Sequence, residues 1–513
     1  MVKQASPPRA GAHGPAALLP PATRPQIVRS RTHEALDTLL VVMPESAGRE
    51  SLAALPDGAR WQALHARERP RAAAVRSTVL TNPRQTLGVL GFLPDAPSRF
   101  EQLQLAGRML KVTAERAPQT VGLVALGSSE HAAAALEALL AATLAEGFAL
   151  PSFKSAADAP PTLRRIVLPH TPRIDTRQAS ASAAGTNLAR WLTALPPNML
   201  DSSGFHSILR RLARRHGLRM SWLGEGALRR LGANAFLAVA AGNAHPTAGI
   251  ARLSYRPARR QRGAPDLALI GKGIVFDTGG VNLKPHSSML EMHTDMSGSA
   301  VALATLIALA ELRAPIAADA WLAISENSIG PRAYRPQEVV RAVNGVTIQV
   351  VHTDAEGRMA LADTLALAAR TRPRLMLDFA TLTGACVRAL TERMSGVFTN
   401  RAALNERLLA AGRASGERVW PFPCEADFDT DLESKVADVM QCAVEGKGDH
   451  ILAARFLGRF VPREIPWAHV DLSAATRTGG LGHVNTEITG FGVRLALELL
   501  LRQNVWDVLE KRS

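Results

Sequence analysis

Two short segments of this 513-residue chain contain acidic and basic side chains of the kind that hold metal ions. In the first, residues 266–300, an apolar run typical of a buried strand ends in Asp277, followed by Thr-Gly-Gly. Glycines let the backbone turn sharply, and open α/β sheets place ligand sites at such strand ends. Lys272 lies on the same run; a buried lysine loses its proton unless it is paired, and only the neutral amine binds a metal. With Lys284 and Asp295 downstream, the segment predicts a metal site.

The second segment, residues 350–365, contains Asp354 and Glu356. Residues two apart in an extended stretch point to the same side, so we expect these two carboxylates to converge. Neighbouring carboxylates repel each other, and metal cations relieve that repulsion. Together with Asp277 and Asp295, they make four carboxylates, enough for two divalent ions with positions open for water and substrate.

Each of these residues also has an ordinary structural explanation. An acidic residue at a strand end, such as Asp277, is commonly a turn former or helix cap, and Asp354 could cap the helix that follows it. Lys272 alone could be an edge residue whose ammonium reaches solvent. The combination of all of them is what favours a metal site.

Strand and helix patterns alternate around both segments. Such alternation predicts a central mixed sheet flanked by helices, hence an α/β fold. The expected strands are 235–241, 266–276, 319–325, 347–352 and 375–380, and the expected helices are 203–216, 298–313, 359–371 and one near 489–502.

The length of the chain favours two domains. Residues 34–180 predict a small N-terminal α/β domain, and residues 181–513 a larger α/β catalytic domain that starts with a linking helix at 181–196. Residues 1–33, rich in Pro, Ala and Arg, are expected to be a disordered extension. In the smaller domain we expect strands at 39–44, 89–94 and 121–127 and a helix at 130–148.

Charge and cysteine content favour a cytoplasmic protein. The net charge of +15 is spread along the chain, so weak attraction to DNA stays open but is not favoured. Cys386, Cys424 and Cys442 show no paired spacing, which indicates a reducing compartment rather than a disulfide framework. We expect no membrane span, because the longest candidate, residues 131–150, carries two glutamates.

The two segments resemble the signature motifs of the leucyl aminopeptidase (M17 metallopeptidase) family. HTDAEGRMALADTL and GKGIVFDTGG carry the likeness, and it continues in order over essentially all of 181–513. The resemblance implies a cytoplasmic homo-hexamer that removes an apolar, Leu-like N-terminal residue from peptide substrates. The supporting segments lie at 333–345, 378–385, 466–474 and 489–495.

By position, the resemblance implies two divalent ions, Zn or Mn. Asp277, Asp354 and Glu356 match the ligands of one ion. The other would be held by Lys272 and Asp295, with Asp277 and Glu356 bridging both. The metals acidify water at near-neutral pH.

The resemblance also implies roles for residues that do not bind metal. Lys284 would polarise the scissile carbonyl, and Arg358 would hold a bicarbonate ion as general base. The positions that match substrate contacts are Met292, Thr381, Leu382 and Gly384.

Several positions depart from the family pattern. His352 replaces an Asn and is expected to be a tolerated neighbour, while Ser297 replaces a common Gly. Asp449 and His450 stand in the 446–457 segment where small residues are expected. An extra metal contact there is not favoured, and His450 is expected to cap a helix.

Three other functions stay open: DNA binding, a structural paralogue without activity, and a dinuclear hydrolase of phosphoesters or non-peptide amides. The intact set of seven catalytic and metal positions argues against the inactive paralogue. The sequence does not fix the preferred N-terminal residue, the native metal or the role of residues 1–33.

Overall fold

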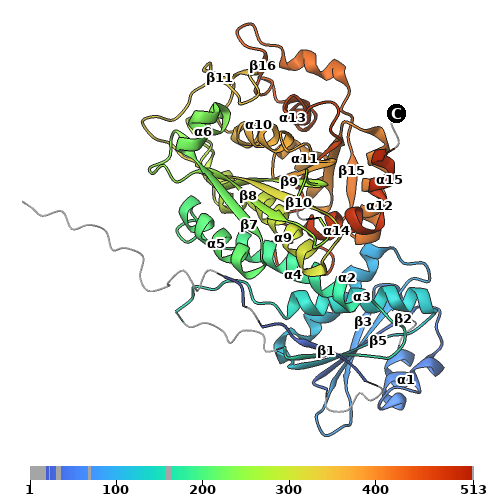
Figure 1. The fold of residues 1–513 in the computed structure, drawn as a ribbon. Helices are drawn as coiled ribbons and strands as arrows, with labels where there is room; N and C mark the ends of the chain where they lie inside the picture. Colours follow the sequence, from blue (N-terminus) through green and yellow to red (C-terminus); the bar gives the residue numbers. More distant parts are fainter. Residues whose placement is uncertain are drawn as a thin grey trace, which may run out of the picture.

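The computed structural model describes residues 19–21, 23–30, 36–67, 71–155, 163–260 and 262–510. It has two α/β units, drawn in blue and in green to red in Figure 1, which meet where α3 packs against α4. Each unit is built around a mixed sheet with helices on its faces, so the predicted fold class is confirmed. A third, three-stranded sheet lies at the far end of the larger unit.

The smaller unit contains a six-stranded sheet of order β1-β6-β5-β2-β4-β3, in which only β3 runs antiparallel to its neighbour. The predicted strands and helix of this unit are all present. The strands are β1 (Gln26–Arg29), β2 (Thr38–Pro44), β3 (Val75–Val79), β4 (Leu87–Leu93), β5 (Thr120–Ala125) and β6 (Arg165–Leu168), and the helices are α1 (Gly58–Ala66), α2 (Arg99–Thr113) and α3 (Ser129–Glu146).

Strand β1 corrects one expectation about the N-terminal extension. Residues 26–29 pair in parallel with 165–168 and satisfy one edge of β6, so disorder is the wrong prediction for them. This pairing joins segments about 140 residues apart, and a local composition bias carries no information about it. Residues 1–18, 22 and 31–33 lie outside the described residues.

The larger unit contains an eight-stranded sheet of order β15-β14-β17-β13-β9-β10-β8-β7. Its four central strands, β17, β13, β9 and β10, are parallel, so their carboxyl ends meet at one edge. The strands are β7 (Arg219–Gly224), β8 (Gly249–Tyr255), β9 (Leu267–Asp277), β10 (Ala318–Asn327), β13 (Leu375–Ala380), β14 (Ser395–Thr399), β15 (Val419–Pro421) and β17 (Trp467–Asp471).

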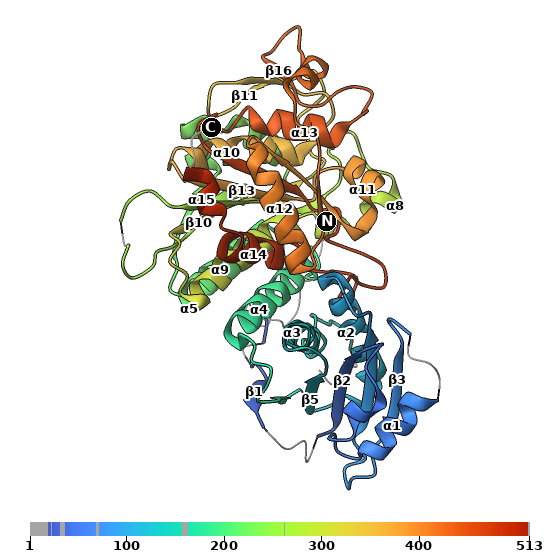
Figure 2. The ribbon, with the colours of Figure 1, turned by 90° about the vertical axis from the view of Figure 1, so that its right-hand side faces the viewer.

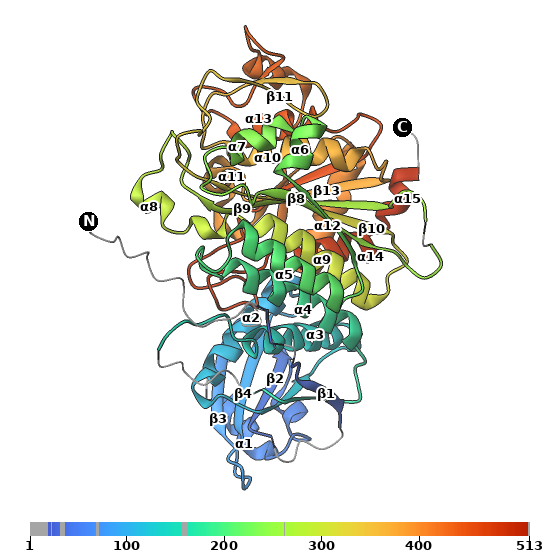
Figure 3. The same cartoon turned by 60° about the vertical axis from the view of Figure 1, so that its left-hand side comes forward.

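Helices cover both faces of this sheet (Figure 3). In β9, Leu267 and Leu269 face the core under α9, whereas Ala268 and Ile270 face the core under α10, as strand alternation requires. One face carries α4 (Thr176–Thr193), α5 (Ser202–Arg215), α9 (Ser297–Leu312) and α14 (Val493–Arg502); the other carries α7 (Asn234–Ala240), α10 (Glu356–Ala369) and α13 (Asp449–Gly458).

Helix α4 connects the two units, lying between α3 and α9 (Figure 2). The boundary predicted at residue 181 falls inside this helix. Asn187 and Arg190 donate hydrogen bonds to the carbonyl oxygens of Leu144 and Ala145 in α3, at 3.0 and 3.1 Å. The remaining helices are α6 (Glu225–Leu231), α8 (His286–Met289), α11 (Gly384–Leu390), α12 (Ala402–Ser415) and α15 (Val505–Glu510).

Two predicted strands are wrong in whole or in part. Of the strand predicted at 235–241, residues 235–240 belong to helix α7. A short apolar run fits a helix or a strand equally well, and this one is alanine-rich. Of 347–352, only Thr347–Gln349 (β12) is extended. It pairs with β11 (Val339–Arg341) and β16 (Val439–Met440) in the three-stranded sheet rather than with the central sheet.

One helical stretch meets the length and composition of a membrane span, contrary to the expectation that none would. It covers 27 residues, His286–Leu312, and 83% of its apolar window is buried inside the protein. Its main part, α9, packs against β9, β10 and β13. Its apolarity is therefore accounted for by its position in the core.

The contact between β9 and α9 leaves no space at Gly271. A Cβ there would lie 2.5 Å from the Cα of Ser299. We therefore expect Gly271→Ala to lower the free energy of unfolding by roughly 1–3 kcal/mol, measured by urea denaturation. Gly226→Ala in α6, where the nearest atom is 3.9 Å away, is the matched control and should be neutral or stabilising. Equal effects of the two substitutions would contradict this packing.

Candidate metal centre

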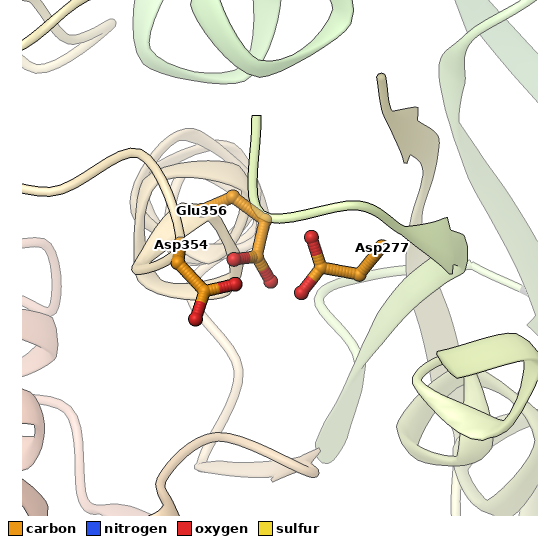
Figure 4. A group of neighbouring side chains, drawn as sticks. All are labelled: Asp277, Asp354 and Glu356. Carbon is orange, nitrogen blue, oxygen red and sulfur yellow. The ribbon is translucent and has the colours of Figure 1, made fainter. Parts of the chain in front are cut away.

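Three carboxylates converge at the carboxyl edge of the central sheet. Asp277 ends β9, Asp354 lies in the turn before α10, and Glu356 is the first residue of α10. An oxygen of each lies within 4.8 Å of an oxygen of the other two. Figure 4 shows the three carboxylates facing a common space. Asp354 and Glu356 do converge, but across a turn and a helix start rather than along an extended strand as expected.

Lys272 joins Asp295 to this cluster. Its ammonium lies 2.8 Å from Asp295 Oδ2 and 2.8 Å from Glu356 Oε1, and it donates to the carbonyl oxygen of Thr381 at 3.0 Å. Thr381 Oγ1 donates to the other oxygen of Asp295 at 2.7 Å. A Cβ on Gly357 would lie 2.6 Å from Lys272 Nζ, so a glycine is needed for this approach.

Lys284 binds the opposite side of the cluster. Its Nζ lies 3.0 Å from Asp277 Oδ2 and 2.5 Å from Asp354 Oδ1. The structure thus brings all five predicted metal ligands and Lys284 into one connected group of side chains.

Burial and mutual repulsion shift the pKa values of the acids. Burial, with repulsion from Asp277, raises the pKa of Glu356 to about 8. Burial also raises the pKa of Asp295 to about 6, against the attraction of Lys272. The pKa of Asp354 is raised for the same reasons, burial first and repulsion from Asp277 second.

The two lysines offset part of the negative charge of the four carboxylates. Burial by itself would lower the pKa of Lys272, but attraction from Asp295 and Glu356 outweighs it and raises the pKa. Lys284 is raised in the same way, chiefly by Asp277. Lys272 was expected to be neutral. It can lose its proton only when cations bind the carboxylates that pair with it here.

The donor set fits divalent cations. Glu356 Oε2 is buried and has no hydrogen bond or ion pair within the described residues. Asp295 Oδ2 and Asp354 Oδ1 have only a lysine ammonium as partner there. Buried carboxylate oxygens without other donors are the ligands that hard and borderline divalent cations take.

Two polar residues that sequence reasoning missed support the cluster. Asn327, at the end of β10, donates to Asp277 Oδ1 at 2.8 Å. Asp471, at the end of β17, accepts hydrogen bonds from the backbone N–H of Leu382 and the hydroxyl of Thr383, at 3.1 and 2.7 Å. Both are polar residues at strand ends, the pattern that singled out Asp277.

The predicted substrate-contacting positions lie beside these ligands. Thr381 and Leu382 lie in the loop after β13 that Asp471 holds, and Gly384 is the first residue of α11. Met292 lies half-buried on the short 3-10 helix that precedes Asp295.

Arg358 is engaged by a residue of α13. Its Nη2 donates to both carboxylate oxygens of Asp449, at 2.9 and 3.0 Å, and its Nη1 to the carbonyl oxygen of Gln441 at 3.3 Å. Burial would lower the pKa of Arg358, but the attraction of Asp449 outweighs it and raises the pKa.

The other departures lie around the site without joining the cluster. His352 is exposed, and its Nδ1 accepts from the backbone N–H of Asp354 at 3.3 Å. Ser297 donates to the carbonyl oxygen of Thr294 at 2.5 Å. His450 does not cap α13 as expected; its ring packs edge-on against Phe422, with the centroids 4.5 Å apart.

Comparison with known proteins identifies the family. The profile described as "Cytosol aminopeptidase family, catalytic domain" matches residues 187–497. The chain belongs to the cytosol aminopeptidase family. The matched range includes both segments that form the cluster, residues 266–300 and 350–365.

Two curated relatives, each named probable cytosol aminopeptidase, are about two-fifths identical to this chain over the aligned residues. The probable cytosol aminopeptidase of Syntrophotalea carbinolica is 42% identical over 320 residues, 62% of this chain and 63% of that protein. That of Stutzerimonas stutzeri is 39% identical over 350 residues, 67% of this chain and 70% of that protein. The first match thus spans less than two thirds of its relative's length.

Solved structures extend the likeness to nearly the whole chain. The bottromycin maturation enzyme BotP in complex with Mn is 30% identical with a TM-score of 0.79, covering 91% of this chain and 99% of BotP. A mutant of tomato leucine aminopeptidase is 25% identical with a TM-score of 0.82, covering 95% and 99%.

The raised pKa of Glu356 predicts how the free energy of unfolding of this cytosol aminopeptidase family member depends on pH after chelation of metal. Folding raises that pKa from its usual 4.5 to about 8. Protonation of Glu356 therefore stabilises the folded state at low pH, and this contribution is lost as the pH rises towards 8. The loss should be on the order of a few kcal/mol, measured by urea unfolding of the chelated protein from pH 5 to pH 8.

Glu356→Gln should remove this part of the pH dependence, whereas the exposed Glu433→Gln should keep it. Identical pH profiles for the wild type and Glu356→Gln would contradict the assignment.

Proposed function

We propose that this chain is a metal-dependent aminopeptidase that removes an apolar, Leu-like N-terminal residue from peptides. The observation that carries the proposal is the buried cluster of four carboxylates and two lysines, in a chain of the cytosol aminopeptidase family. Relatives bear the name cytosol aminopeptidase. A cytoplasmic location and a homo-hexamer are part of the same proposal and rest on the family resemblance.

The residues present fit two divalent ions. Asp277, Asp354 and Glu356 would hold one ion, and Lys272 and Asp295, together with Asp277 and Glu356, would hold the other. When bound, such ions activate water and act as Lewis acids towards the substrate carbonyl. Zn and Mn both suit this donor set, and the BotP structure in complex with Mn supports manganese as one candidate.

Lys284 is the positioned cation that does not bind metal in this proposal. Its ammonium lies at the edge of the cluster and is half-buried. With divalent cations on Asp277 and Asp354, the Lys284 ammonium would be free to donate a hydrogen bond to the scissile carbonyl oxygen. A preorganised donor there stabilises negative charge on that oxygen as the water attacks.

The loop after β13 would position the peptide. Asp471 accepts hydrogen bonds from the backbone N–H groups of Leu382 and Thr383, and the Thr381 hydroxyl donates to Asp295. Rigid backbone groups at this loop lower the cost of orienting the substrate. Met292 would form the apolar side of the pocket for the N-terminal side chain.

The residues present do not fit a bicarbonate ion on Arg358. Asp449 already takes both hydrogen bonds of Nη2, and Gln441 takes one from Nη1. A second anion at this edge of the guanidinium would face the Asp449 carboxylate, and the two like charges would repel each other. No step of the proposed function therefore depends on bicarbonate.

The direct test is release of leucine from a Leu-initiated dipeptide after chelation and reconstitution with Zn or Mn. We expect metal-restored cleavage, no cleavage of the N-acetylated dipeptide, and a loss of at least about 100-fold in kcat/KM for Asp354→Asn because a metal ligand is removed. Asp431→Asn, an exposed acid, is the matched control and should keep full activity.

A folded wild type that releases no leucine with either metal would contradict the aminopeptidase function. Cleavage of the N-acetylated dipeptide would instead contradict the requirement for a free amine.

A further inference from the structure

Arg358 and Asp449 form an ion pair that has no role in the aminopeptidase function proposed above. Arg358 lies in the first turn of α10, two residues after Glu356, and its side chain is only 3% exposed. Asp449 is the first residue of α13, and its side chain is 25% exposed. One end of the pair is thus buried beside the metal ligands, and the other is accessible to solvent.

The backbone before α13 positions Asp449 beside Arg358. Gly446 and Gly448 both adopt positive φ, 66° and 62°, so the backbone turns into α13 through conformations that favour glycine. Helix α13 packs against α10, the helix that carries Arg358. Gln441 holds the guanidinium from its other side through its backbone carbonyl oxygen.

The buried guanidinium requires a negative partner. A buried charge without one costs several kcal/mol, and a carboxylate is the partner whose geometry suits arginine. Here the partner is Asp449 of the same chain. It pairs with the guanidinium that was expected to hold a bicarbonate ion. Carboxylate and bicarbonate are both planar oxyanions, and they compete for the same donors.

We propose that the Asp449 carboxylate takes the place of a dissolved bicarbonate ion on Arg358 and serves as the proton acceptor for the attacking water. The inference rests on the aminopeptidase function proposed above. As the water oxygen bonds to the carbonyl carbon, one water O–H bond breaks and its proton passes to an Asp449 Oδ atom. When the C–N bond breaks, the same proton passes to the leaving amine nitrogen, so the carboxylate is regenerated.

The test combines binding and kinetics on the metal-loaded enzyme. Titration with ¹³C-bicarbonate, followed by ¹³C NMR, should show binding to Asp449→Ala and none to the wild type. In CO2-free buffer the wild type should cleave Leu-dipeptide at a rate that added bicarbonate does not change. Asp449→Ala should lose about 10²- to 10⁴-fold in kcat, and bicarbonate should restore part of it.

Two further variants separate charge from structure. Asp449→Asn fills the same space without the charge, so it should be slow and not rescued by bicarbonate. Asp429→Ala is the control, because it removes a different ion pair, the one that Asp429 makes with Arg455 of α13 at 2.7 Å. This variant should cleave at the wild-type rate and should not bind bicarbonate.

Bicarbonate binding to the wild type, or stimulation of its rate, would overturn the proposal. So would a slow Asp449→Ala variant that neither binds bicarbonate nor is rescued by it, since the ion pair would then be structural only. A wild type without activity would overturn the aminopeptidase function and the proton-transfer role together, while the NMR titration would still decide whether Asp449 occupies the anion position.

Discussion

Repulsion among buried carboxylates is the constraint on which the rest of this structure depends. Asp277, Asp295 and Glu356 are each at most 5% exposed, and the attraction of Lys272 and Lys284 holds them together. Burial, together with that repulsion, raises the pKa values of Glu356 and Asp295. Divalent cations would satisfy the same carboxylates more fully than two lysines do, and the proposed metal centre rests on this fit.

The fold supplies this cluster by ending parallel strands at one edge. Strands β9, β10, β13 and β17 deliver Asp277, Asn327, the loop after Ala380, and Asp471 to the same side of the sheet. Helix α10 begins there with Glu356, whose carboxylate lies near the positive end of the helix dipole. The two cores on either face of the sheet fix the relative positions of these elements, so precision at the site follows from packing far from it.

The sequence was sufficient for the mixed α/β fold and for the grouping of Lys272, Asp277, Asp295 and Asp354 with Glu356, because these residues lie in two motifs with specific spacing. Sequence reasoning failed where the deciding contact is distant along the chain. The pairing of β1 with β6, the support from Asn327 and Asp471, and the ion pair of Arg358 with Asp449 each depend on which segments the fold makes neighbours. The strand predicted at 235–241 is wrong for a local reason: a run of seven apolar residues fits a buried helix as well as a strand.

The central claim is that the carboxylate cluster holds two divalent ions, and anomalous diffraction from crystals grown with MnCl2 or ZnCl2 tests it most directly. The account predicts two anomalous peaks per chain, both contacted by Asp277 and Glu356, with Asp354 on one and Lys272 and Asp295 on the other. It also predicts that Lys284 no longer pairs with Asp277. A single peak, or no peak with the carboxylates still paired to both lysines, would contradict this claim.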